Sequence, residues 1–205
     1  MDAVRVALLR DVLAGTEWLG ATRRFAGALR GSVVSHGGGL LLVGGPGYEP
    51  WHLAAHLVDE AAWSATPELA PTLVRQDARP SDPAHLAVGP GRLAAARRGE
   101  TLLVVSPAEA GAALLEGVHD ARRAGATVLA LGGGDGGGAG ELAAMAHELL
   151  AVPEGAELDL DTVQHLVSAA AGENAAPSPA RGRRRFRDRL SRLADELTAP
   201  PPARW

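Results

Sequence analysis

The chain has 205 residues, of which 46% are apolar and only 3% aromatic, and its formal net charge is −4. This length suits one domain with appendages, built around a core of Ala, Leu and Val. The absence of cysteine excludes disulfides and thiolate chemistry. No apolar run approaches 18 residues, and the first ten residues include the charged Asp2, Arg5 and Arg10. We therefore expect a cytoplasmic protein with no membrane contact and no signal peptide.

The charge is distributed unevenly along the chain. Residues 1–180 carry 12 Arg and 21 acidic residues, a net charge of −9, whereas residues 181–205 carry 8 Arg and 3 acidic residues, a net charge of +5. The basic excess therefore belongs to the C-terminal segment. This segment has a single Phe and no recognised nucleic-acid module, so we expect no nucleic-acid partner. Instead, we expect an amphipathic helix that packs on another subunit or on the acidic body.

In the first half of the chain, segments with apolar residues at helical spacing alternate with short apolar runs typical of strands. Leu40–Val43 is a short apolar run flanked by glycines, which is typical of a buried parallel strand. Pro50 suits the first turn of a helix, where its missing N–H costs nothing. Residues 65–91 contain five prolines and form no clear long element. The elements predicted here are helices within residues 2–31, a strand at 40–43, a helix from Pro50 to about Ser64, and a short strand at 73–74.

The second half alternates between the two patterns more regularly. Apolar residues at helical spacing precede Gly125, which is a common C-terminal stop. The elements predicted here are helices at 91–98, 108–124, 141–146 and 159–171, and strands at 101–106, 126–131 and 148–152. Strands that alternate with helices indicate an α/β fold with a doubly wound parallel sheet of five strands. The predicted units are N-terminal helices (1–31), an α/β domain (32–172), a linker (173–181) and a basic helical tail (182–205).

The most informative stretch covers residues 37–56. Residues 37–47 read GGGLLLVGGPG, and the helix that follows carries His52 and His56 on one face. A strand, a glycine-rich turn and a helix together form the unit in which α/β proteins hold anionic ligands.

Four segments resemble the SIS (sugar isomerase) domain, and within it the phosphoheptose isomerase group. They are residues 38–57, residues 98–106, residues 121–133, and residues 135–137 together with 152–153. The resemblance implies a flavodoxin-like three-layer sandwich, a phosphorylated sugar as ligand, and a homodimer or homotetramer whose sites lie between subunits. It also implies that the N-terminal helices take part in oligomerisation.

The two loops that hold the sugar phosphate in this family are altered here. Residues 44–48 read GGPGY and lack the family's serine, and residues 106–111 read SPAEAG and keep a single hydroxyl, that of Ser106. Pro107 removes a backbone donor, and Glu109 brings a negative charge that would repel a phosphate. The ligand contacts predicted by this resemblance are Gly44, Gly45, Gly47, Tyr48, Glu49, Ser106 and Glu109.

The histidines suggest a metal site. In the zinc-dependent members the matching helix supplies a His and a Glu, and a late helix supplies a Gln and a His. His52 matches the first His, His56 stands where the Glu would be, Asp161 falls near the Gln, and Ala169 occupies the place of the last His. Because His165 lies one turn after Asp161, His52, His56, Asp161 and His165 form two pairs at i,i+4 spacing, which suits zinc or another divalent ion. The alternative is that these rings contact only solvent or neighbouring side chains.

Three functions remain open at this stage. The first is a SIS-domain protein that binds a phosphorylated sugar or a related small anion in a regulatory role. The second is a divergent metal-dependent phosphosugar isomerase, an aldose–ketose isomerase in which His52 or His56 would be the catalytic base. The third is a protein-interaction module akin to SIS relatives that assist replication initiation. Trp51 and Trp63 are expected to pack internally or to lie in a dimer interface.

Overall fold

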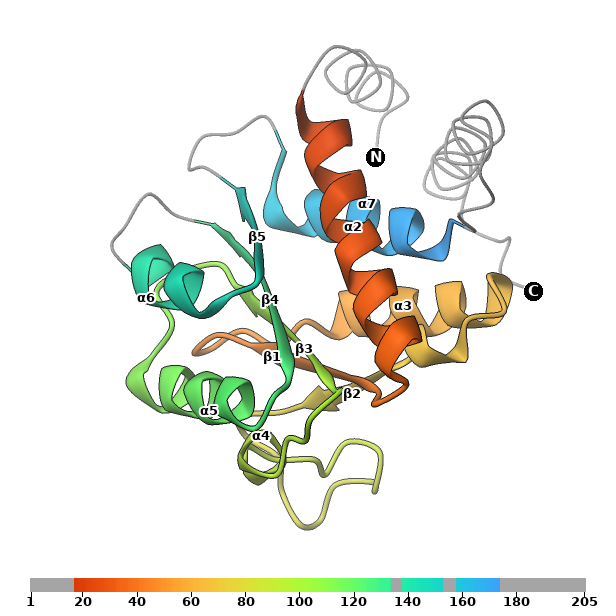
Figure 1. Ribbon diagram of the computed structural model, residues 1–205. Helices are drawn as coiled ribbons and strands as arrows, with labels where there is room; N and C mark the ends of the chain where they lie inside the picture. Colours follow the sequence, from red (N-terminus) through yellow and green to blue (C-terminus); the bar gives the residue numbers. More distant parts are fainter. Residues whose placement is uncertain (1–16, 134–137, 153–157, 174–205) are drawn as a thin grey trace, which may run out of the picture.

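The computed structural model describes residues 17–133, 138–152 and 158–173, and helices cover both faces of one sheet in it (Figure 1). All strand pairs are parallel, and the strand order is β2-β1-β3-β4-β5. The strands are β1 (Leu40–Gly44), β2 (Pro71–Val74), β3 (Thr101–Ser106), β4 (Thr127–Gly133) and β5 (Glu148–Val152). The predicted five-stranded, doubly wound parallel sheet is thus confirmed. Within the described ranges, no helix is long and apolar enough to span a membrane.

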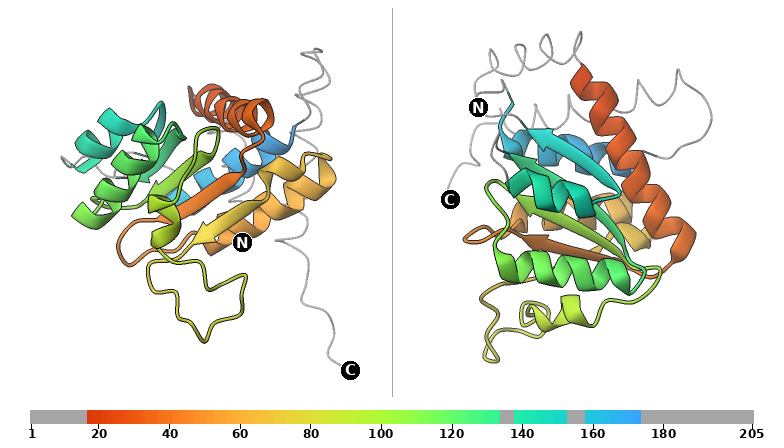
Figure 2. Two further views of the ribbon diagram at one scale, coloured as in Figure 1. Left: turned by 60° about the horizontal axis from the view of Figure 1, so that its bottom comes forward. Right: turned by 60° about the vertical axis from the view of Figure 1, so that its left-hand side comes forward.

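The helices divide between the two faces of the sheet, as both views of Figure 2 show. One face carries α2 (Glu17–His36), α3 (Trp51–Trp63) and α7 (Leu160–Gly172). The other carries α4 (Gly91–Ala94), α5 (Ala112–Arg123) and α6 (Gly138–Met145). A short 3-10 helix, η1 (Pro67–Leu69), precedes β2.

Alternate residues of the strands supply the two cores. Leu40 and Leu42 pack with the α2, α3 and α7 side, whereas Leu41 and Val43 pack with the α4, α5 and α6 side. Every residue of β1 and β3 is buried. This two-sided burial is why both strands are nearly continuous apolar runs.

The two helices that matter for the site begin at recognisable signals. Pro50 occupies the N-cap position of α3, one residue before the first turn in which it was predicted. Asp159 caps α7, where its side chain accepts a hydrogen bond of 2.7 Å from the backbone N–H of Thr162.

Several predicted boundaries were wrong. Helix α2 continues to His36, beyond the predicted end at residue 31, because Ser32 and Val33 are buried against the core. α5 begins at Ala112, four residues later than predicted, and α4 covers only Gly91–Ala94 of the predicted 91–98. Four segments lie outside the described residues, namely 1–16, 134–137, 153–157 and 174–205, and the last of these holds most of the 173–181 linker and all of the 182–205 tail. The predictions made for them stay predictions.

Candidate functional site

The candidate site lies at the carboxyl ends of β1 and β3. The chain leaves β1 toward β2 at one side and returns to β3 at the other, so these two central strands form the switch point of the sheet. In open α/β sheets, ligands bind in the crevice at such a point. Two loops meet there, residues 45–50 after β1 and residues 107–111 after β3.

The first loop turns back tightly on itself. A Cβ atom at Gly44 would overlap the carbonyl oxygen of Tyr48, so only glycine fits there. The N–H of Tyr48 donates to the carbonyl of Gly45 over 3.1 Å, and Gly47 has φ +69°, a conformation that glycine adopts freely. The predicted glycines therefore shape this loop, whether or not they also contact a ligand.

The second loop uses its polar groups internally. Ser106 is 2% exposed, and its hydroxyl donates to the carbonyl of Ala108 over 2.6 Å. A Cβ at Gly45 would overlap the Ser106 Oγ, so the two loops are in close contact. The N–H of Gly45 donates to the carbonyl of Val105 over 2.8 Å. Two of the donors predicted to hold a phosphate thus already have partners, and the exposed Glu109 adds negative charge.

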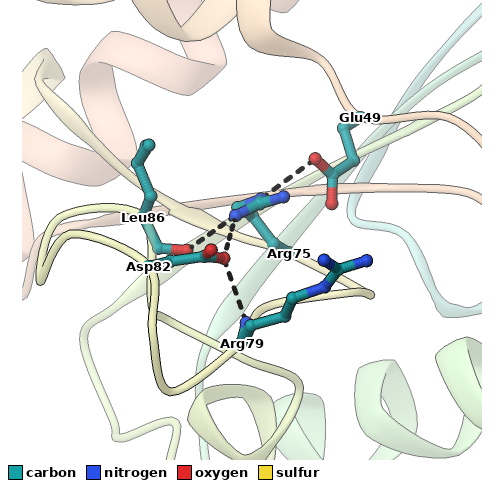
Figure 3. A network of polar contacts seen from close by, with 5 residues as sticks. All are labelled: Glu49, Arg75, Arg79, Asp82 and Leu86. Carbon is teal, nitrogen blue, oxygen red and sulfur yellow. Dashed lines mark hydrogen bonds and ion pairs between the residues drawn. The ribbon is translucent and has the colours of Figure 1, made fainter.

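Glu49, another predicted ligand contact, is bound by an arginine that the sequence did not reveal (Figure 3). Arg75 Nε lies 3.1 Å from Glu49 Oε2, and Arg75 Nη1 lies 2.7 Å from Asp82 Oδ2. Arg75 Nη1 also donates to the carbonyl of Leu86 over 3.1 Å, and its guanidinium lies 4.9 Å from the ring centroid of Trp51. The end of β2, the segment 79–88 and the start of α3 are joined by this one side chain.

The charges of this network support one another. The backbone N–H of Arg79 donates to Asp82 over 3.0 Å, and this bond, with the Arg75 contacts, lowers the pKa of Asp82 despite partial burial. In turn, the carboxylate of Glu49 raises the pKa of Arg75, with Asp82 adding to the effect. Arg75 is already satisfied by two carboxylates, so it offers little free positive charge to an anion.

Three histidines converge beside these loops. His52 and His56 lie one turn apart on α3, and His165 reaches them from α7, which packs alongside α3. The ring centroids are 4.7 Å apart for His52 and His56 and 4.4 Å apart for each pair with His165. Each ring offers one nitrogen to a group whose atoms all lie within 4.8 Å of one another. The structure thus brings together three of the four predicted metal ligands.

Burial favours the uncharged form of two of these histidines, His165 and His56. Burial, followed by the nearby rings of His56 and His52, lowers the pKa of His165 to about 4. The pKa of His56 is lowered for the same reasons, burial first and then His52. His56 Nε2 and His165 Nδ1 are buried and have no hydrogen-bond partner. Neutral imidazoles with unused nitrogens are the form in which histidine binds metals.

The fourth predicted ligand, Asp161, is not one of the three residues that form this group, as far as the described residues go. Its Oδ1 accepts hydrogen bonds from the Tyr48 hydroxyl over 3.3 Å and from Gln164 Nε2 over 3.1 Å. Gln164 Nε2 also donates to the Tyr48 hydroxyl over 2.8 Å. Burial, opposed by the Gln164 bond and helped by the Asp161 charge, raises the pKa of Tyr48. This network ties the first loop to α7 within one turn of His165.

Gln164 was missed in the sequence. It is 2% exposed, and its Oε1 is buried without a hydrogen-bond partner. Its only signal is a polar residue on the apolar face of a helix, next to Val163, which is a weak indication of a site by itself.

The comparisons with known proteins identify the fold. No protein-family profile matches the sequence, and no curated protein matches it either. Among solved structures, the chain is 16% identical to the sugar isomerase domain of the RpiR transcription factor from Sphaerobacter thermophilus, with a TM-score of 0.53 over 93% of this chain and 96% of that one. The predicted SIS fold is thus confirmed.

Two further solved structures share this fold. A candidate sugar binding protein from Salmonella typhimurium LT2 matches with a TM-score of 0.56 at 16% identity over 92% of this chain. A candidate phosphosugar isomerase from Silicibacter pomeroyi DSS-3 matches with a TM-score of 0.51 at 16% identity over 94%. The chain spans about half of each of these longer proteins, 52% in both cases.

Proposed function

We propose that this SIS-fold domain binds a phosphorylated sugar or a related small anion, and that His52, His56 and His165 hold one divalent metal ion at the same site. The observation that carries the proposal is the cluster of three rings with nitrogens within 4.8 Å, two of them buried without a partner. A buried polar atom without a partner is costly and therefore needs an explanation. A bound metal ion supplies one.

The donor set fits a transition metal. Imidazole nitrogens suit zinc, copper, nickel and iron, whereas magnesium and calcium prefer oxygen ligands. Three protein ligands leave a coordination position free, as in zinc sites that bind a further molecule. A metal bound there would attract an anionic or carbonyl oxygen as a Lewis acid. It would provide the positive charge that the altered loops do not.

The internal hydrogen bonds of the two loops favour a binding or regulatory role over catalysis. Ser106 and the N–H of Gly45 already have internal partners, and Arg75 is held by Glu49 and Asp82. Catalysis of proton transfer also needs a positioned acid and base. The histidine rings that would act as the base are the same rings that would bind the metal.

The second candidate is the metal-dependent aldose–ketose phosphosugar isomerase. The observation in its favour is the hydrogen bond between the Tyr48 hydroxyl and Asp161, one turn from His165. A carboxylate and a hydroxyl beside a metal site are suitable groups to accept and return a proton. Isomerisation of a sugar phosphate by the zinc-loaded protein, lost in Asp161→Asn with metal content unchanged, would establish this function.

The metal proposal is tested on the full chain without a histidine tag. After chelator treatment and desalting, calorimetric titration with zinc should show one equivalent bound. His56→Ala and His165→Ala should each weaken binding at least tenfold, since each removes one ligand. His119→Ala, on the exposed side of α5, is the matched control and should bind like the parent. Binding of less than about a tenth of an equivalent, or equal binding by all variants, would refute the metal site.

The ligand proposal is tested by thermal shift with ribose 5-phosphate, glucose 6-phosphate and the two unphosphorylated sugars, with and without zinc. We expect a rise in melting temperature for the phosphates only, and a larger rise with zinc. Glu109→Gln should enlarge the response because it removes a nearby negative charge. Glu116→Gln, exposed on α5, should leave it unchanged. No response in any variant would refute phosphate binding while leaving the metal result standing.

A further inference from the structure

Helix α3 is apolar on two opposite sides. Its inner side is buried in the core through Leu53 and Leu57. Its outer side is exposed and also apolar, with Trp51 at 41% and Val58 at 49% exposure. The exposed small or apolar residues on this side recur at i, i+4, i+7 and i+11, and they are Trp51, Ala55, Val58 and Ala62. A surface helix ordinarily has only one apolar stripe, so the outer stripe indicates a partner.

A groove of about 620 Å³ continues this stripe toward the edge of the sheet. It lies between the outer side of α3, the edge strand β2 and the segment 85–88. Leu73, Leu86 and Val88 add apolar surface, and Asp59 adds a carboxylate. The groove therefore fits an amphipathic segment with basic residues beside its apolar face.

The C-terminal segment of this chain starts close to α3. Arg30 donates to the carbonyl of Ala171 over 2.9 Å and to Thr66 Oγ1 over 2.7 Å. The last turn of α7 therefore lies beside the residues that follow α3. From there residues 174–185 can extend about 40 Å, whereas the 13 residues of α3 span only about 20 Å. The segment beyond them can reach the whole outer side of the helix.

The sequence of that segment matches the stripe in spacing, and its net charge is opposite to that of the rest of the chain. Its apolar residues also recur at i, i+4, i+7 and i+11, and they are Phe186, Leu190, Leu193 and Leu197. As a helix, these residues would form one face. Residues 181–205 carry a net +5 and residues 1–180 a net −9. Opposite net charges favour association of the segment with the rest of the chain, and Asp59 places one carboxylate at the groove itself.

We propose that residues 182–205 form an amphipathic helix that docks, within the same chain, on the outer side of α3 and in the adjoining groove. Phe186, Leu190, Leu193 and Leu197 contact the stripe formed by Trp51, Ala55, Val58 and Ala62. The inference is independent of the ligand and metal proposals.

The absence of cysteine allows a direct proximity test on the full chain. The double variant Val58→Cys with Leu190→Cys is treated at low protein concentration with a short bis-maleimide, which avoids the strict geometry of a disulfide. We expect a cross-link within one chain, identified by intact mass and peptide mapping. In the control pair, Glu116→Cys with Leu190→Cys, the first cysteine replaces an exposed residue of α5, on the opposite face of the sheet from α3. Its cross-link should form at least tenfold more slowly.

Hydrogen exchange gives a second and independent measurement. Leu190→Asp with Leu193→Asp should release the segment and speed amide exchange in residues 51–63, whereas Arg192→Gln should change it little. A cross-link that joins two chains would show that a second copy occupies the groove and would overturn the proposal. Equal cross-linking of both pairs, or no change in exchange, would also overturn it.

Discussion

Two regions at the same edge of the sheet differ in how their polar groups are used. In the loops after β1 and β3, the Ser106 hydroxyl and the Gly45 N–H have partners inside the chain. In the histidine cluster, His56 Nε2 and His165 Nδ1 have none. A buried polar atom costs free energy until a partner is supplied. These two loop donors are therefore satisfied without a ligand, whereas the cluster has free ring nitrogens that can receive one.

The largest expected effect on stability comes from the tight packing of the first loop at Gly44. In Gly44→Ala the new Cβ overlaps the carbonyl oxygen of Tyr48, and backbone cannot move aside easily. We expect a loss of at least about 3 kcal/mol in the free energy of unfolding, measured by urea denaturation.

Gly47→Ala is the matched control for this loop. Its Cβ would meet nothing within 4 Å, so only the positive φ is penalised, at about 1 kcal/mol. Equal losses in the two variants would show that the loop is not packed as tightly as described.

The next largest effect is the stabilisation expected when zinc binds the free ring nitrogens of the histidine cluster. An ion bound only by the folded protein stabilises it by about 2.7 kcal/mol at a hundred times its dissociation constant. We expect zinc to raise the free energy of unfolding of the chelator-treated protein by this amount. The gain should vanish in His56→Ala. A gain that persists there would place the zinc elsewhere.

The cluster should also make the metal-free protein sensitive to acid. The pKa of His165 is lowered to about 4, whereas an unfolded histidine has a pKa near 6.5. Between these values the unfolded state binds a proton that the folded state does not, so stability is lost as the pH falls from about 6.5 to about 4. Because water screens the partly exposed rings, we expect about 1–2 kcal/mol.

The variant His165→Asn tests whether His165 causes this loss of stability in acid. Urea denaturation at pH 7 and pH 4.5 should show a smaller acid loss for it than for the parent. His119→Asn, which changes an exposed residue of α5, should keep the full loss. If all three proteins lose the same amount, the acid loss does not come from a buried His165.

The sequence predicted the elements better than the contacts between them. β1 is recognisable because burial on both faces makes it continuously apolar, and His52 and His56 share a face because helical spacing requires it. Arg75 was not foreseen, since its partners Glu49 and Asp82 come from other segments of the chain. Asp161 was grouped with the histidines by its place in the family pattern and its spacing from His165, yet its carboxylate lies with Tyr48 and Gln164. Spacing fixes the helix face and not the side-chain partner.

The smallest effect tests whether the second loop is closed to ligands. Ser106→Ala removes the hydroxyl that donates to the carbonyl of Ala108, and we expect a loss of about 1 kcal/mol in the free energy of unfolding. Because the hydroxyl is committed to this bond, the affinity for glucose 6-phosphate in the presence of zinc should change less than twofold. A loss of tenfold or more, with stability unchanged, would mean that Ser106 turns to the ligand. In that case the loops and the histidines would form one anion site, and the contrast between the two regions would fail.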